Sequence, residues 1–319
     1  MNKKALSYLC IFFLLVLFFS GCEKRNERDN PYRIAVITMM QGGEFWGEVK
    51  NGARNARTET GAVLEFFAPV NESDYEEQIA CVEKAITQKF DAIVLTPSHS
   101  TKLEEVVRKA QAKGIEVVLA DTSLKNRLGD FSVTADYHAI GKKMGYHAFS
   151  LFDADEPINA MVLGSLPNTT AMTNMVEGLV EAFGENDKAT IRYATYSFTD
   201  ESIARKITQK TIGDDPSVNV IFALEENTAH GAIDALGENS KVRFIALGTT
   251  QYEIQLLENN TIDALVVVNT FNMGYRSVKA AIDLLNGKKP IEKLVDYALV
   301  TKQTMFSEEH QRLLFQSLN

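Results

Sequence analysis

Apolar and polar residues follow one another along the chain in blocks that predict strands and helices in alternation. The run from Ile34 to Ile37 is wholly apolar, which is typical of a strand covered on both faces in a parallel sheet. A Gly42-Gly43 turn follows, and a helical segment then opens with the adjacent aromatic residues Phe45 and Trp46. Similar blocks recur at intervals of roughly 25 to 35 residues, as βαβ units do. The pattern therefore predicts an α/β protein with parallel sheets flanked by helices.

The blocks fall into two series. Gly61 and Gly114 each follow a helix of the first series, where a left-handed C-cap is expected. The second series begins at about Asp136, and no glycine- or serine-rich linker divides it from the first. Two such series imply two lobes packed about a cleft. The predicted strands are 34–39, 63–67, 92–96, 116–121, 131–134, 159–163, 190–196, 218–224, 243–247, 262–268 and 294–301, and the predicted helices are 44–60, 75–88, 102–113, 139–152, 171–183, 201–212, 228–236, 251–259 and 273–286.

The amino terminus has the form of an export signal. Two lysines precede an apolar run from Ala5 to Phe19, and a Ser-Gly pair leads to Cys22. An apolar core this short, with a basic start, is typical of a signal peptide and not of a membrane span. The ending resembles the bacterial lipoprotein signal, with Phe19 where leucine is most frequent. We therefore predict a lipoprotein signal peptide at 1–21 and an acylated Cys22 with a membrane tether at 22–31; a plain secretory leader or an uncleaved anchor is the alternative.

Length, charge and cysteine content narrow the class of protein. A chain of 319 residues exceeds the size of one hydrophobic core, so two domains are expected. The net charge of −9 argues against a nucleic-acid partner, which needs a concentrated basic face. Cys10 leaves with the signal peptide and Cys22 would be acylated, which leaves Cys81 without a disulfide partner.

Motifs of catalysis and of phosphate or metal binding are missing from the sequence. It contains neither a GxxxxGK[ST] phosphate loop nor a GxSxG nucleophile elbow. The five histidines lack both the spacing and the carboxylate partners of a zinc helix. We therefore predict a binding protein without metal or cofactor and not an enzyme, with an extracytoplasmic hydrolase as the enzyme alternative.

Polar and aromatic residues gather at the predicted strand ends, which in two facing α/β lobes converge on one crevice. Phe45 and Trp46 would offer a ligand flat faces of low conformational entropy, although they could also simply pack the corner between strand and helix. Asp121 follows an apolar strand, where its carboxylate could accept bonds from ligand hydroxyls or amines or cap the following loop. Within the pair Glu225-Glu226, we interpret Glu226 as a solvated helix start.

At this point the chain resembles the type I periplasmic binding proteins, the ribose-binding-like solute receptors of ABC importers. The resemblance implies two Rossmann-like lobes, joined by three crossovers near residues 135, 269 and 297, that close around one small solute. It places 32–135 plus 269–297 in an N-terminal lobe and 136–268 plus 298–319 in a C-terminal lobe. The segments that carry it are EFWGEVKNGA at 44–53, DYEEQIACVEKAITQKFDAIVLTPS at 74–98, KAQAKGIEVVLADT at 109–122, VEGLVEAF at 176–183, VNVIFALEENTAHGAI at 218–233 and NTFNMGYRSVKAAIDLLNGKKP at 269–290.

The resemblance also carries over site residues. Phe45 and Trp46 match the family's stacking aromatics, and Asp121 matches an aspartate that bonds sugar hydroxyls. Other sugar contacts are lost, which removes bidentate donors and adds a carboxylate, so a pentose bound in the usual way is not expected. The family's two arginines, asparagine, second aspartate and glutamine are replaced here by Thr122, Thr173, Glu225, Gly248 and Val268, in that order.

Together these features predict a lipid-anchored, extracytoplasmic, monomeric receptor that captures a small polar solute and presents it to an ABC permease. A carbohydrate is the first choice of solute, and Glu225 favours an amine-bearing or otherwise unusual one. A receptor for a membrane sensor kinase is the alternative, whereas a repressor is excluded because an export leader occupies the place of a helix-turn-helix. The predicted ligand-binding residues are Gln41, Phe45, Trp46, Asp121, Thr122, Thr173, Phe198, Glu225 and Asn269.

Overall fold

A computed structural model of the protein describes residues 30–237, 240–291 and 294–316. The predicted signal peptide, the acylated Cys22 and most of the predicted tether lie outside these residues. From Tyr32 onward the chain forms one compact unit, and its strands form two separate sheets. The prediction of two α/β lobes is therefore confirmed. Within the described ranges, no helix is both long enough and apolar enough to cross a membrane.

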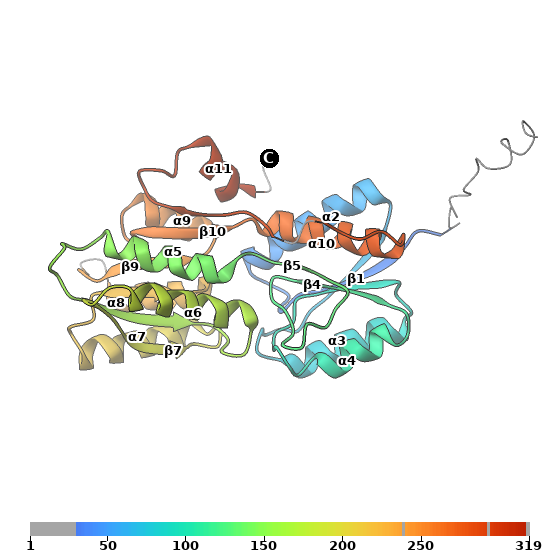
Figure 1. Ribbon diagram of the computed structural model, residues 1–319, viewed down its shortest axis with the longest axis horizontal. Helices are drawn as coiled ribbons and strands as arrows, with labels where there is room; N and C mark the ends of the chain where they lie inside the picture. Colours follow the sequence, from blue (N-terminus) through green and yellow to red (C-terminus); the bar gives the residue numbers. More distant parts are fainter. Residues whose placement is uncertain (1–29, 238–239, 292–293, 317–319) are drawn as a thin grey trace, which may run out of the picture. The chain divides into compact units, whose positions relative to one another are not determined.

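The first sheet of the described residues contains five parallel strands in the order β2-β1-β3-β4-β5. Helices α2 and α10 lie side by side on one face, and α3 and α4 cover the other (Figure 1). The central strands are buried on both sides, as their apolar runs predicted. The elements are β1 (Arg33–Ile37), α2 (Glu44–Thr60), β2 (Val63–Phe67), α3 (Tyr75–Thr87), β3 (Ala92–Leu95), α4 (Glu104–Gln111), β4 (Glu116–Ala120), β5 (Phe131–Val133) and α10 (Thr270–Leu285).

The second sheet has six strands within the described ranges, in the order β11-β10-β9-β8-β6-β7. Helices α5 and α6 pack on one face, and α7, α8, α9 and α11 share a hydrophobic core with the other. The elements are α5 (Tyr137–Phe149), β6 (Ile158–Gly164), α6 (Thr170–Gly184), β7 (Ala189–Tyr196), α7 (Glu201–Asp214), β8 (Val220–Ala223), α8 (Glu226–Leu236), β9 (Arg243–Leu247), α9 (Gln251–Glu258), β10 (Ala264–Val268), β11 (Tyr297–Val300) and α11 (Glu308–Leu314).

Two elements differ from the sequence prediction. Strand β11 is antiparallel to β10, because the chain leaves the sheet at Val268, passes through α10 and returns at Tyr297, directly opposite Val268. A strand that re-enters beside the end of its neighbour must run in the reverse direction. Helix α11 was not predicted; it is short, and Ser307 caps its first turn by accepting a bond from the backbone N–H of His310.

Three chain segments connect the lobes and are hydrogen-bonded to one another. Thr134, which follows β5, forms a bridge with Leu294, and the N–H of Val295 donates to the carbonyl of Thr134 at 2.9 Å. The N–H of Asn269 donates to the carbonyl of Asp296, also at 2.9 Å. The crossings therefore form one narrow strip of backbone, as a hinge with three crossovers requires.

Helices α2 and α10 approach each other through glycines. A Cβ atom at Gly52 would lie 1.8 Å from the carbonyl oxygen of Phe271, and one at Gly274 would lie 1.8 Å from that of Val49. Neither helix could come this close with a side chain at the crossing. The contact joins the first and last helices of the N-terminal lobe, which are far apart in the sequence.

We expect Gly52→Ala to destabilise the protein by about 1–3 kcal/mol or more, because the added methyl group forces the two helices apart. Gly47→Ala is the matched control in the same helix, since no atom lies within 4 Å of its Cβ position. That change should be neutral or stabilise by up to about 1 kcal/mol through helix propensity. Urea unfolding measures both variants, and equal stabilities would contradict the close crossing.

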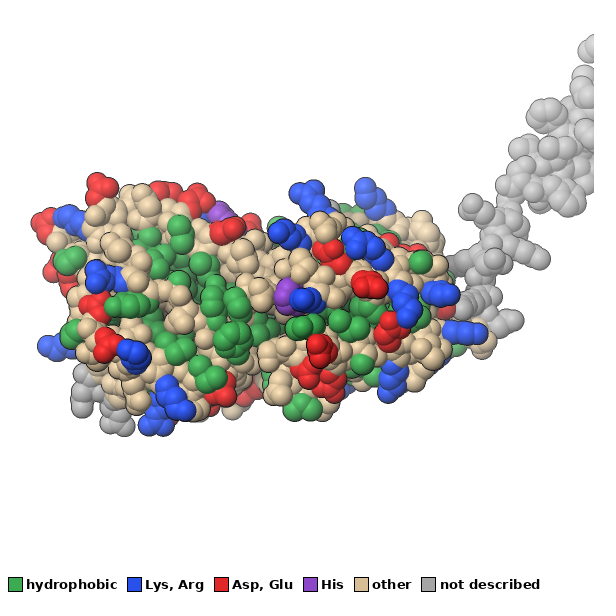
Figure 2. All heavy atoms as spheres, turned by 90° about the horizontal axis from the view of Figure 1, so that it is seen from below, with side chains coloured by type: hydrophobic (Ala, Val, Ile, Leu, Met, Phe, Trp, Pro, Cys, Tyr) green, Lys and Arg blue, Asp and Glu red, His purple; other side chains and the backbone are tan. Residues whose placement is uncertain are grey.

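Charges of both signs are interspersed on the face of the molecule in Figure 2, where Lys and Arg side chains stand among Asp and Glu. A nucleic-acid interface needs basic side chains gathered on one face. The described residues on this face show no such gathering.

Candidate functional site

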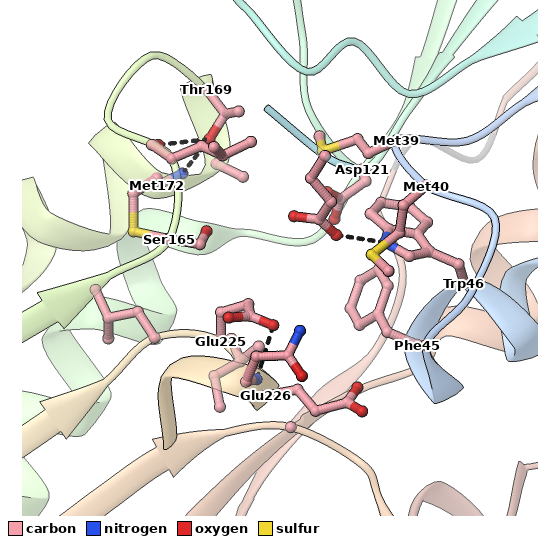
Figure 3. Close-up of a pocket in the computed structure, with 18 of the residues that line it drawn as sticks. Met39, Met40, Phe45, Trp46, Asp121, Ser165, Thr169, Met172, Glu225 and Glu226 are labelled. Atoms are coloured by element: carbon pink, nitrogen blue, oxygen red, sulfur yellow. Dashed lines mark hydrogen bonds between the residues drawn. The ribbon is translucent and has the colours of Figure 1, made fainter. Parts of the chain in front are cut away.

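A cavity of about 80 Å³ lies where the carboxyl ends of strands from both sheets meet (Figure 3). A single water needs roughly 10–15 Å³ of such space, so the cavity admits several water-sized groups and suits a small molecule. Its apolar wall consists of Met39, Met40, Phe45, Trp46, Leu166, Met172, Met175, Leu224 and Leu247, and its ionisable groups are Glu72, Asp121, Tyr137, Glu225 and Glu226.

The aromatic pair lies in the first turn of α2, as the sequence predicted. The rings of Phe45 and Trp46 meet edge to face, with centroids 4.8 Å apart. Trp46 is only 4% exposed and belongs to the hydrophobic core, yet it also lines the cavity. The pair therefore packs the strand-helix corner and forms one wall of the cavity, so the two interpretations of these residues are compatible.

Asp121 follows β4 and has an unusual backbone conformation. Its φ of 64° lies in the left-handed region, which Asp tolerates better than most residues. Thr134 holds this conformation by donating from Oγ1 to the Asp121 carbonyl at 2.6 Å, and the Tyr137 hydroxyl donates to Oδ1 of the side chain. Burial raises the pKa of Asp121 to about 6, although the bond from Tyr137 opposes the shift. Strain of this kind is frequent at binding sites.

Glu225 lines the cavity and is the N-cap residue of α8. Its carboxylate accepts bonds from the backbone N–H groups of Asn227 and Thr228 at 2.9 and 3.0 Å, and from Oγ1 of Thr228 at 2.8 Å. These bonds fix the carboxylate at the positive end of the helix dipole. Burial nevertheless raises the pKa of Glu225.

Glu226 begins α8, as expected, but its predicted solvation is wrong. The side chain is only partly exposed and lines the cavity beside Glu225 (Figure 3). Burial and the neighbouring Glu225 charge raise the pKa of Glu226 to about 7.

Glu72 is a site residue that the sequence did not indicate. It lies in the loop between β2 and α3, is 7% exposed, and accepts a bond of 2.5 Å from Nε1 of Trp46. Burial, together with the nearby Glu225 charge, raises the pKa of Glu72 to about 8. The indole is thereby held between the hydrophobic core and a buried carboxyl group.

Five of the nine predicted residues lie outside the lining of this cavity, because local bonds or exposure hold them elsewhere. Gln41 donates from Nε2 to the carbonyl of Ala68, and Thr173 donates from Oγ1 to the carbonyl of Thr169 one turn earlier in its own helix. Asn269 caps α10 by accepting a bond from the N–H of Asn272. These three side chains therefore form hydrogen bonds with nearby backbone atoms.

The other two residues outside the lining are Thr122 and Phe198. Thr122 pairs its Oγ1 with that of Thr170 at 2.8 Å and accepts a bond from the Thr170 N–H at 3.0 Å. It therefore links the loop after β4 to the start of α6, where the resemblance expects an arginine for the ligand. Phe198 has a φ of 55° and is 50% exposed.

Residues missed by sequence reasoning are mostly methionines and groups from loops. Met172 and Met175 are spaced i, i+3 on α6 and so face the same side, which is a signal of a buried face but not of a cavity. Tyr137 could be placed at a crossover from the sequence, but its bond to Asp121 is tertiary.

Taken together, the residues that line the cavity can bind and orient a small molecule between apolar walls and carboxyl groups.

Comparison with known proteins agrees with this geometry. A family model described as "Periplasmic binding protein domain" matches residues 34–289. The ribose import binding protein RbsB of Bacillus subtilis is 22% identical over 307 residues, which cover 93% of this chain and 98% of that protein.

Solved structures share the fold over nearly their whole length. An ABC transporter solute-binding protein from Agrobacterium vitis with bound D-fucose is 27% identical, with a TM-score of 0.83 over 88% of this chain and 99% of that one. A chain of the XylFII-LytSN complex is 23% identical, with a TM-score of 0.79 over 86% of this chain and 99% of that one. Since the family model spans elements of both lobes, the chain belongs to the periplasmic binding protein family.

Proposed function

We propose that the protein is an extracytoplasmic solute-binding lipoprotein that captures a small polar ligand, a carbohydrate or a related compound, for an ABC importer. The observation that carries this proposal is the cavity lined by strand-terminal side chains from both lobes. A ligand held there contacts both lobes at once, and its binding energy favours the arrangement in which they meet. Membership of the family and the sugar-binding names of its relatives support the choice of ligand.

The location and the division into lobes belong to the same proposal. The basic, apolar and small-residue blocks of 1–21 support export, and Cys22 supports a lipid anchor on the outer face of the membrane. The N-terminal lobe comprises 32–135 plus 269–297, and the C-terminal lobe comprises 136–268 plus 298–319. The protein binds its solute as a monomer, without a metal, a cofactor or a chemical step.

Each site residue has a role in holding the solute. Phe45 and Trp46 provide an apolar face for stacking, and Asp121 accepts hydrogen bonds from ligand hydroxyl or amino groups. Glu225, fixed by its cap bonds, acts from the opposite lobe.

Ligand binding should change the fluorescence of Trp46, because it is the only tryptophan in the chain and lines the cavity. A thermal-shift screen of sugars, polyols and amino sugars identifies the ligand first, since binding raises stability by RT ln(1 + [L]/Kd). Asp121→Asn, which tolerates the left-handed backbone, should weaken binding about 10-fold or more through loss of a charged acceptor. The exposed Asp187→Asn is the control. A ligand whose affinity is unchanged by Asp121→Asn and Trp46→Ala would remove the assignment.

A second candidate function is that of a ligand-sensing receptor subunit for a membrane histidine kinase. It is favoured by the similarity to a chain of the XylFII-LytSN complex, in which a protein of this fold is bound to a second protein. Genes for a permease and an ATPase beside this gene would favour import, whereas genes for a kinase and a response regulator would favour sensing.

A further inference from the structure

The cavity concentrates acidic side chains without a basic partner. Glu72, Asp121, Glu225 and Glu226 all line it, and its lining includes no Lys, Arg or His among the described residues. Asp121 lies on one side of the cavity and Glu225 and Glu226 lie on the opposite side (Figure 3). An occupant between them meets carboxyl groups from both lobes.

A further acidic side chain lies directly behind the lining. Gly248 lines the cavity, and a Cβ atom there would lie 2.0 Å from Oε2 and 2.2 Å from Oε1 of Glu253. Glu253 is fully buried, and its Oε2 accepts bonds from the N–H and Oγ1 of Thr250. Its Oε1 has no hydrogen-bond partner among the described residues. A fully buried acceptor thus remains unpartnered beside the cavity.

A buried acceptor without a partner reduces the stability of the folded protein, and so does a set of like charges in one apolar site. Without a cation these groups must retain protons, and the pKa values of Glu72 and Glu253 are both raised to about 8, mainly by burial. The titratable groups that act on Glu72 are Glu225, Asp121 and Glu226, and those that act on Glu253 are Glu226 and Glu225. A neutral sugar supplies hydroxyl donors but leaves these carboxyl groups protonated, whereas a positive charge favours their ionised form.

We infer that the solute carries a positively charged amino group, held between Asp121, Glu72 and Glu225, with its remaining atoms against the methionine and aromatic wall. The inference rests on the proposed function and specifies its substrate class. An ammonium group has three donors, enough to bond carboxylates from both lobes at once. The ring faces of Phe45 and Trp46 also attract a cation.

A metal ion is the other cation that carboxylates bind. The described residues contain no group of three or more His, Cys, Asp or Glu placed to hold one. The acidic groups share the cavity with apolar side chains, among them Met39, Phe45 and Met172. This mixed lining fits an organic cation with a body of several atoms.

The inference is tested with pairs of compounds that differ in the amine alone: glucosamine and glucose, galactosamine and galactose, putrescine and 1,4-butanediol. Thermal shift at pH 7 on the mature, unlipidated chain ranks the pairs, and calorimetry gives Kd and proton release in two buffers of different ionisation enthalpy. We expect the amine of at least one pair to bind at least 10-fold more tightly than its neutral partner. Its binding should release protons, because the ammonium group favours ionised carboxylates.

Variants assign the effect to the carboxyl groups. Glu72→Gln keeps an acceptor for Nε1 of Trp46, whereas Glu225→Gln keeps one acceptor oxygen of the two that now bond Asn227 and Thr228. Each variant should weaken amine binding at least 10-fold. Glu76→Gln, on an exposed face of α3, should leave it unchanged.

The contrary outcomes are distinct. Neutral compounds that bind as tightly as their amines, without proton release, would overturn the inference and leave the proposed function standing. A shift produced by CaCl2 or MgCl2 and not by the amines would assign the carboxyl groups to a metal and also overturn it. A panel in which no compound binds would count against the inference and the proposed function alike.

Discussion

The unliganded protein is expected to lose stability as the pH rises from 5 to 9. Burial raises the folded-state pKa of Glu72 and of Glu253 from 4.5 to about 8, and that of Glu226 to about 7. Between pH 4.5 and 8 the folded state therefore holds more protons than the unfolded state. The stability that these extra protons contribute is fully present below the pKa of the unfolded state. It is lost as the pH rises through the pKa values of the folded state.

The expected loss is at least a few kcal/mol, because each unit of pKa difference in a buried group corresponds to about 1.4 kcal/mol and three groups contribute. This direction is opposite to that of most proteins, in which paired carboxylates make acid the destabilising condition. Urea unfolding at pH 5, 7 and 9, without ligand, measures it.

Glu72→Gln should flatten this dependence. The amide oxygen can still accept the bond from Nε1 of Trp46, so the variant should match the parent protein near pH 5. Near pH 9 it should be the more stable of the two, since no buried charge forms at position 72. The control Glu76→Gln should keep the parent slope. A parent protein as stable at pH 9 as at pH 5 would refute the raised pKa values.

The sequence predicted the fold well because apolar blocks mark the strands and glycines mark the ends of helices. Strands β2 and β9 have the predicted bounds, 63–67 and 243–247, and Gly61 forms the expected left-handed C-cap of α2 with a φ of 70°. Strand β11 could not be oriented, because its direction depends on where the chain re-enters the sheet. Periodicity records which face is buried but not the path between elements.

For the site, the sequence was informative where a residue adjoins a strand end. Phe45, Trp46, Asp121 and Glu225 all follow strands of the two sheets and line the cavity. Glu72 lies in a polar loop, and only the folded structure shows that it is buried and bonded to Trp46. The binding roles of these residues remain predictions.

Residues at strand ends that do not line the cavity mark the limit of this reasoning. Thr122 and Asn269 occupy suitable places in the chain, but their short side chains bond to nearby Thr170 and Asn272. Local acceptors and donors of this kind compete for Ser, Thr, Asn and Asp side chains. Position along a strand therefore predicts proximity to the site better than contact with its occupant.

Gly248→Asp, which introduces the aspartate that the family resemblance expects, should be strongly destabilising. The Cβ atom alone would lie within 2.3 Å of three carboxyl atoms of Glu253, which is fully buried. Overpacking typically costs about 1–3 kcal/mol, and a second carboxyl group in the same space adds a buried polar group without room for partners. Gly184→Asp, at a position with no atom within 4 Å of its Cβ, should cost less than about 1 kcal/mol as an exposed substitution.

The double variant Gly248→Asp/Glu253→Ala separates two explanations. Either the introduced carboxyl group clashes with that of Glu253, or position 248 tolerates no side chain at all. Glu253→Ala alone removes the capping box with Thr250 and should cost about 0.5–2 kcal/mol. If the two carboxyl groups exclude each other, the double variant should be more stable than Gly248→Asp, despite that loss. Urea unfolding of the four proteins gives the coupling energy, and additive costs would contradict the exclusion. A favourable coupling would mean that the carboxyl group beside the cavity comes from α9 in this protein, in the space that an aspartate after β9 would otherwise fill.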